Sequence, residues 1–102
     1  MKRLKAIRLN ENKPGLSDTR LTWAAIGIYH EFVEKEYTID LERYCIEKNL
    51  PYNNELFKGL ESLEKFGYCY YFKERRFYIL FNEPVNKVLA ENEYQKIKVE
   101  II

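Results

Sequence analysis

The sequence predicts an α+β fold, and three stretches of the chain support this prediction. Residues 53–68 read as an amphipathic helix, because their apolar side chains recur at helical spacing. Residues 40–52 read as a shorter helix and a tight turn that leads into it. Residues 68–81 hold two aromatic runs in strand-like alternation on either side of a charged turn. With one more helix before them, these elements follow the order of a winged helix-turn-helix domain, in which three helices precede a β-hairpin wing.

Length and composition favour one globular domain with little net charge. The chain has 102 residues, of which 46% are hydrophobic, enough for one modest core and too many for a disordered chain. Its 17 basic and 16 acidic side chains leave a net charge of +1, so nucleic-acid affinity must come from a local basic patch. The sequence holds no apolar run of membrane-spanning length and no secretory signal. We therefore expect one domain over residues 1–102, with no membrane partner, in the cytoplasm (that of the host, if the protein is viral).

Residues 1–16 are expected to form an N-terminal arm, followed by the helix-turn-helix and its wing over residues 17–82. Residues 4–9 read as a short strand. Neither side of this strand is cleanly apolar, so we expect it to lie at the edge of a sheet. Pro14 and Gly15 then mark a turn.

The first two helices are expected to begin at capping side chains. The first helix can begin at Thr22, or a little earlier at Ser17 or Asp18. Asp40 can cap the second, over residues 41–49. Gly27 lies inside the first helix, where glycine costs about 1 kcal/mol relative to alanine. A close crossing by another helix is the expected reason for this glycine. Pro51 disfavours helix at the residue before it, so the turn into the third helix follows.

The third helix carries its own start and stop signals. Asn53 can accept a backbone N–H of the first turn, and Gly67 can adopt the left-handed conformation that ends a helix. The apolar face between them is formed by Leu56, Phe57, Leu60 and Leu63. We expect this helix to be the core of the fold.

Residues 83–102 are expected to form a C-terminal appendage. Pro84 suits the first position of a short fourth helix that ends near Asn92. Residues 97–101 alternate strictly and could form a terminal strand. Such a strand could pair with residues 4–9 or with a partner chain.

Two motifs resemble a known family. Residues 21–29 read Leu-Thr-Trp-Ala-Ala-Ile-Gly-Ile-Tyr, and the end of the third helix reads Leu60-x-x-Leu63-Glu64-x-x-Gly67-Tyr68. Both are similar to the winged-helix N-terminal domain of DnaD-like replication-initiation proteins and phage replisome organisers. The resemblance covers about residues 4–76. It implies DNA binding or replisome assembly, with self-association, and no catalytic residues.

Three groups of side chains are candidates for contact with double-stranded DNA. In a helix-turn-helix the third helix enters the major groove, while basic wings and arms contact phosphates. The start of the third helix contributes Tyr52, Asn53, Asn54 and Lys58. The wing tip contributes Lys73, Arg75 and Arg76, and the N-terminal arm contributes Lys2, Arg3, Lys5 and Arg8.

Each of these groups also has an ordinary structural interpretation. Asn53 and Asn54 suit a helix cap and turn, the wing tip suits a solvated turn, and the arm suits a charged edge strand. Three glutamates against two lysines give residues 54–65 a charge of −1, which phosphates repel. Three basic side chains against one acidic side chain give residues 73–76 a charge of +2. We therefore expect the wing and the arm to make the basic contacts.

The alternative function is a protein–protein interaction module, viral or host-directed, that keeps the fold without reading DNA. The low net charge and the acidic third helix favour it. Aromatic side chains are enriched at the cores of interfaces, and Tyr70, Tyr71 and Tyr78 are the candidate anchors on the outer face of the hairpin.

The sequence does not favour an enzyme, a metal site, a cofactor or a small-molecule substrate. His30 is the only histidine and suits a half-exposed structural position. Cys45 and Cys69 have no metal-ligand spacing and are expected to be reduced and buried. No glycine-rich phosphate loop is present.

Overall fold

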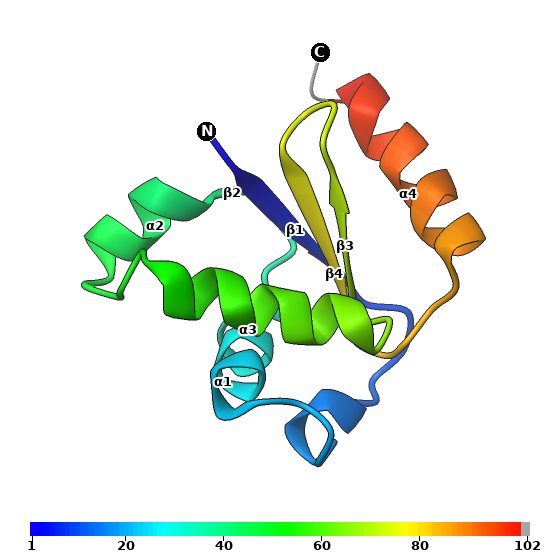
Figure 1. The fold of residues 1–102 in the computed structure, drawn as a ribbon. Coiled ribbons are helices and arrows are strands. Elements are labelled where there is room, and N and C mark those ends of the chain that lie inside the picture. The colour runs from blue at the N-terminus through cyan, green and yellow to red at the C-terminus, as the bar shows by residue number, and fades with distance from the viewer. Residues whose placement is uncertain (101–102) are drawn as a thin grey trace.

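A computed structural model describes residues 1–100 and has four α-helices and a four-stranded mixed sheet in that part of the chain (Figure 1). The elements in chain order are β1 (Arg3–Ile7), the 3-10 helix η1 (Pro14–Leu16), α1 (Trp23–Phe32), β2 (Ile39–Asp40), α2 (Leu41–Glu47), α3 (Asn54–Lys65), β3 (Cys69–Phe72), β4 (Phe77–Phe81) and α4 (Lys87–Glu100). The strand order in the sheet is β2-β1-β4-β3. The predicted α+β class is confirmed.

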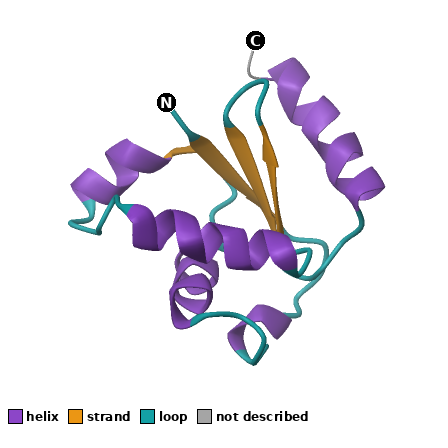
Figure 2. Ribbon diagram, in the orientation of Figure 1, coloured by secondary structure: helices purple, strands orange, loops and turns teal. Residues whose placement is uncertain are grey.

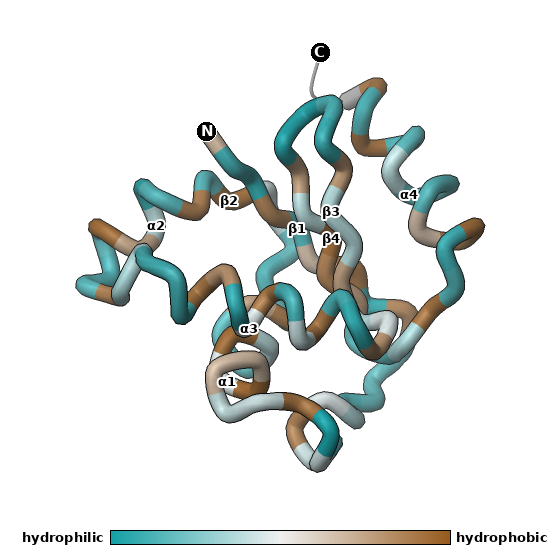
Figure 3. The backbone as a smooth tube through the Cα atoms, viewed as in Figure 1, coloured by the Kyte–Doolittle hydropathy of each residue, from teal (hydrophilic) through white to brown (hydrophobic). Residues whose placement is uncertain are grey.

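The sheet separates two groups of helices (Figure 2). All five side chains of β4 are buried, and they alternate between two hydrophobic clusters. Tyr78 and Leu80 pack with residues of α1, α2 and α3, whereas the other three side chains of the strand pack with α4. Hydrophobic and hydrophilic residues alternate along α3 and α4, as expected of helices that cover a sheet (Figure 3).

The predicted helix caps are confirmed. The Thr22 side chain accepts a hydrogen bond from the Ala25 N–H (3.2 Å), and the Asn53 side chain accepts one from the Glu55 N–H (3.0 Å). The Asp40 side chain accepts from the N–H of the third residue of α2. Gly67 has a φ of 83°, so the predicted left-handed stop of the third helix is confirmed as well.

The glycine at the helix crossing is Gly59 and not Gly27. A Cβ atom at Gly59 would lie 2.4 Å from Ile28 Cδ1 and 3.1 Å from the Ala24 carbonyl carbon, so α1 and α3 approach too closely for a side chain. A Cβ atom at Gly27 would meet nothing within 4 Å. The explanation of Gly27 by a helix crossing is therefore wrong.

The N-terminal strand lies inside the sheet and not at its edge. β1 pairs in parallel with β4 along its whole length, and Arg3 and Leu4 also pair antiparallel with β2. Leu4 and Ala6 are buried, while the alternate residues are only half-buried. The edge prediction was wrong because one face of β1 lies beside an incompletely covered part of the sheet, which allows polar residues on an interior strand.

The C-terminal segment is a long helix where a short helix and a strand were predicted. Helix α4 begins after Asn86, whose side chain accepts a hydrogen bond from the Leu89 N–H (2.9 Å), so Pro84 is not its first residue. Ala90, Tyr94 and Ile97 recur at helical spacing and pack in the cluster of Phe77, Ile79 and Phe81. Helical burial against the sheet therefore outweighs the local alternation of residues 97–100, and residue 101 of the expected strand lies outside the described residues.

Asn82 joins the end of β4 to the loop after β1. This fully buried side chain accepts a hydrogen bond from the Leu9 N–H (2.7 Å) and donates to the Asn12 carbonyl oxygen (2.8 Å) and to Asn10 Oδ1 (2.8 Å). The Tyr29 hydroxyl donates to the backbone carbonyl of Asn82. One amide side chain thus fixes the loop that leads from the sheet to α1.

Replacing this amide should destabilise the fold. We expect Asn82→Ala to lower the free energy of unfolding by about 3 kcal/mol, because buried backbone groups of the loop lose their partners. Chemical denaturation measures this change. Asn92→Ala removes an exposed amide of α4 and serves as the control, with an expected change within about 0.5 kcal/mol. Equal effects of the two variants would contradict the role of Asn82.

The two helical glycines should respond oppositely to alanine. We expect Gly27→Ala to stabilise the protein by about 0.5–1 kcal/mol, because alanine favours helix and meets open space at this position. We expect Gly59→Ala to destabilise it by about 1 kcal/mol, because the overpacking penalty at the crossing is larger than the gain from the higher helix propensity of alanine. Thermal unfolding of dilute protein compares the pair, and a stabilising Gly59→Ala would refute the close crossing.

Candidate functional site

The pairing of β1 with β4 brings two predicted basic segments to one end of the sheet. The Arg3 N–H donates a hydrogen bond to the Arg76 carbonyl oxygen (3.0 Å), at the point where the hairpin turn enters β4. The N-terminus and the β3–β4 turn accordingly lie at the same end of the molecule (Figure 1). The basic residues of the two segments at this end, which we call the hairpin-tip cluster, are Lys2, Arg3, Lys73, Arg75 and Arg76.

The hairpin turn presents three of these cations to solvent. Residues 73–76 are all exposed, and the Arg76 N–H donates to the Lys73 carbonyl oxygen (3.2 Å) to close the turn. Arg76 has a φ of 52°, in the left-handed region that costs a residue with a Cβ atom roughly 1–2 kcal/mol. Glycine or asparagine would adopt this conformation more readily. The turn thus holds an arginine at a position that backbone geometry disfavours for it.

The single acidic side chain of the turn is neutralised from within the protein. Glu74 forms an ion pair with Lys98 Nζ of α4 (2.7 Å) and accepts a hydrogen bond from the Tyr94 hydroxyl (3.4 Å). The hydrogen bond from Lys98 is the main cause that lowers the pKa of Glu74. Among the side chains of residues 1–99, no carboxylate lies at ion-pair distance from Lys73, Arg75 or Arg76. The turn therefore keeps its positive charge available for an external anion.

Lys2 connects the hairpin-tip cluster to α3. Its Nζ lies 4.3 Å from the centroid of the Phe57 ring and 5.5 Å from that of Tyr71, both at cation–π distance. Burial raises the pKa of the nearby Glu64 carboxyl, and the charge of Lys2 partly offsets this rise. Lys2 is thus held in the space between the helix and the hairpin, whereas the cations of the turn are exposed.

The start of α3 does not extend the basic cluster. The Asn53 side chain is used as the helix cap, and Tyr52 packs edge-on against Phe57 with ring centroids 5.4 Å apart. Asn54 and Lys58 are exposed. The other exposed charged residues of the helix are Glu55, Glu61 and Lys65, so its solvent face carries two positive and two negative charges. This face is neutral, and the positive charge lies at the tip of the hairpin.

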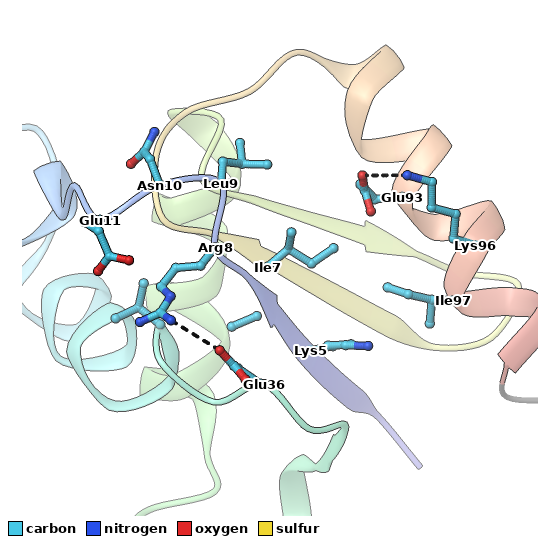
Figure 4. Close-up of a pocket in the computed structure, with 12 residues that line it drawn as sticks. Lys5, Ile7, Arg8, Leu9, Asn10, Glu11, Glu36, Glu93, Lys96 and Ile97 are labelled. Carbon is cyan, nitrogen blue, oxygen red and sulfur yellow. Dashed lines mark hydrogen bonds and ion pairs between the residues drawn. The ribbon is translucent and has the colours of Figure 1, made fainter.

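Arg8 lies at the far end of β1, away from the hairpin-tip cluster. It lines a hollow of about 480 Å³ between β1 and α4 (Figure 4) and forms an ion pair with Glu36 (3.2 Å). Lys5 lines the same hollow, and Lys96 on its α4 side pairs with Glu93 (3.2 Å). The basic side chains of the hollow are thus interleaved with acids. The sequence did not predict that α4 contributes Lys98 to the hairpin tip and Lys96 to the hollow, because the segment that carries them was expected to include a strand. The helical spacing from Ala90 to Ile97 was the signal that could have shown it.

The three tyrosines expected on an exposed hairpin face are largely enclosed. Tyr78 is only 5% exposed, because β4 has a strand on each side and the Tyr71 ring packs against it at a tilt, with ring centroids 4.4 Å apart. Burial is the first cause of the raised pKa of Tyr78. The Tyr70 hydroxyl donates to the Val85 carbonyl oxygen (2.6 Å). The placement of Tyr78 on an outer face is therefore wrong, and Tyr70 and Tyr71 are half-buried packing residues.

The histidine and the two cysteines lie in different environments. His30 is exposed on α1. Cys45 and Cys69 are buried free thiols, and burial raises the pKa of each. In residues 1–100 no group of three His, Cys, Asp or Glu side chains is arranged to hold a metal ion. None of the helices described in residues 1–100 is long and apolar enough to span a membrane.

Comparison with known proteins gives no match, whether with protein-family models, with curated proteins or with solved structures. The fold and the surface therefore define the class: an α+β domain in which α1, α2 and α3 lie against one face of a mixed sheet and α4 lies against the other. Its most distinctive charged feature is the hairpin-tip cluster.

The strained turn leads to a prediction about stability. We expect Arg76→Asn to leave the melting temperature unchanged or to raise it, with a gain of up to about 1 kcal/mol, because asparagine tolerates the left-handed conformation better. Arg75→Asn makes the same chemical change at the neighbouring position, whose φ is not positive, and should give no gain. Thermal unfolding of both variants checks this, and a clear loss for Arg76→Asn alone would show that the arginine stabilises the turn.

Proposed function

We propose that the protein binds the phosphate backbone of double-stranded DNA through the hairpin-tip cluster, on a winged helix-turn-helix scaffold whose wing is the β3–β4 hairpin. The observation that supports this proposal most directly is the contact between Arg3 and Arg76, which joins the N-terminal arm and the hairpin turn into one basic surface. The order α1, β2, α2, α3 and hairpin supports the scaffold assignment.

The chemistry of the cluster suits phosphate. Guanidinium groups bind phosphate oxygens with paired N–H donors, and lysines add mobile point charges. Duplex DNA carries one charge per roughly 1.7 Å along its axis, so neighbouring cations on one surface can contact successive phosphates. The ion pair of Glu74 with Lys98 removes the one repulsive charge within the turn. Such contacts position a protein on DNA without reading its sequence.

Helix α3 has a secondary part in this proposal. Its exposed polar side chains, Asn54 and Lys58, are available for a groove, but its face has no net positive charge. We therefore propose weak sequence preference, with affinity supplied by the wing and the arm. Replication initiation or transcription control are the processes that this binding would serve, and the resemblance of residues 21–29 to replication-initiation proteins favours the first.

Binding to a duplex should be strongly salt-dependent. If Arg3 and the three exposed cations of the turn each neutralise one phosphate, log K should fall against log salt with a slope of about −3 to −4. Arg75→Ala with Arg76→Ala should weaken binding to all sequences and reduce the slope by about 2. Fluorescence anisotropy of a labelled duplex over a range of salt concentrations measures both quantities.

The control is a second double variant with the same change in net charge. Lys48→Ala with Lys87→Ala removes two exposed cations outside the hairpin-tip cluster and should leave the slope nearly unchanged. Failure to detect binding at about 50 mM salt, where electrostatic binding is strongest, would reject the proposal. Equal losses in the two double variants would show that net charge and not the cluster is responsible.

One observation favours protein interaction as a second candidate function. Trp23 on α1 is 92% exposed, and Ala24, the residue that follows it, lines a mostly apolar groove between α1 and the start of α3. This surface lies on different elements from the hairpin tip, so the two functions do not exclude each other.

A further inference from the structure

Helix α4 ends beside the hairpin turn (Figure 1). The Tyr94 ring stacks flat on Phe72, the last residue of β3, with ring centroids 4.1 Å apart and an interplanar angle of 3°. Its hydroxyl lies 3.4 Å from one carboxylate oxygen of Glu74, and Lys98 Nζ lies 2.7 Å from the other. Tyr94 and Lys98 are four residues apart, so they lie on one face of the helix. Both carboxylate oxygens of Glu74 are therefore held by α4.

The two lysines near the end of α4 differ in what they bind. Lys96 pairs with Glu93 of the same helix, and 71% of its side chain is exposed. Lys98 pairs with the hairpin turn, and only 29% of its side chain is exposed. Lys96 thus contributes to its own helix alone, whereas Lys98 joins the helix to the turn. Because the two lysines carry the same charge on the same helix, Lys96 is a matched control for Lys98.

Glu74 requires a partner because of its neighbours in the turn. It lies between Lys73 and Arg75, and Arg76 follows. An unpaired carboxylate at this position would repel a bound phosphate, since charges within a Debye length of about 8 Å at physiological salt act on one another. It could also pair with a cation of the turn and withdraw that cation from phosphate. The ammonium of Lys98 prevents both effects.

We propose that Lys98 is a positioning residue for the phosphate contacts of the hairpin turn. It binds Glu74 and not phosphate, and it holds the turn against α4 while the cations of the turn stay exposed. A charge-assisted hydrogen bond already engages its ammonium, and this bond is the main cause that lowers the pKa of Glu74. The role rests on the proposed DNA binding and extends it, because it makes α4 a necessary part of the wing.

A double-mutant cycle tests this role. Lys98→Met keeps the aliphatic stem and removes the charge, and Glu74→Gln removes the carboxylate charge at nearly constant shape. In fluorescence anisotropy with a labelled duplex at about 50 mM salt, Lys98→Met should weaken binding about tenfold, because it leaves an unpaired carboxylate beside the phosphates. When Glu74→Gln is already present, Lys98→Met should weaken binding by no more than about twofold. The ion pair lies at the surface, so the variants should fold like the wild type.

Lys96→Met is the control, because it removes an equal charge from the same helix. It should weaken binding by no more than about twofold, whether or not Glu74→Gln is present. A direct contact between Lys98 and phosphate predicts a different result: Lys98→Met would lower the affinity by the same factor with and without Glu74→Gln, and would reduce the salt slope by about 1. That result would overturn the positioning role and leave the DNA binding intact.

A measurement without DNA separates this role from the proposed function. In an NMR titration of the wild-type protein, the pKa of the Glu74 carboxyl should lie below the usual glutamate value of about 4.3, and Lys98→Met should raise it toward that value. Tyr94 and Arg75 also lower this pKa and remain in the variant, so the rise reports Lys98 alone. An unchanged pKa would overturn the role, even if the wild type binds DNA. Absence of duplex binding by the wild type would overturn the proposed function, and this role with it.

Discussion

The parallel pairing of β1 with β4 is the contact on which the rest of the structure depends. It joins the N-terminus to a strand near the end of the domain. Closing such a long loop lowers the entropy of the chain, and local interactions do not offset this loss. The burial of Leu4 and Ala6 offsets this cost, and the hydrogen bonds of Asn82 secure the loop beyond the strand. With β1 in place, the sheet has two faces that helices can cover.

The same pairing creates the charged surface. Arg3 is held beside Arg76 by a backbone hydrogen bond, so two basic segments that are distant in the sequence share one end of the sheet. Helix α4 completes this surface from the other side, because its packing against β4 brings Lys98 to Glu74. The cations of the hairpin turn have no ion pair with a carboxylate among residues 1–99, and the backbone at Arg76 is left-handed. The surface is thus a consequence of topology and not of a basic composition.

Local signals in the sequence predicted where most helices begin and end. The position of β1 in the sheet and the helical state of residues 97–100 depend on tertiary packing. Thr22, Asp40, Asn53 and Gly67 act within a few residues of themselves, so their roles as caps and stop were readable. The interior position of β1 was not readable, because its half-polar face reflects the partial cover of the sheet. The alternation of residues 97–100 alone fits a strand as well as a helix, and the packing of Tyr94 and Ile97 against β4 favours the helix. For the candidate site, the basic segments were identified from charge alone, but their union at one surface, the part of Lys98 and the burial of Tyr78 required the strand order.

Hydrogen exchange of the β1 amides tests the central claim most directly. If β1 is an interior strand, its amides that bond to β4 should exchange only through global unfolding, with protection free energies within about 1 kcal/mol of those in β4. Such protection would establish the hairpin-tip cluster as one fixed surface. Exchange of the same amides at the rate of an unstructured arm would contradict the account, since Arg3 and Arg76 would then have no fixed relation.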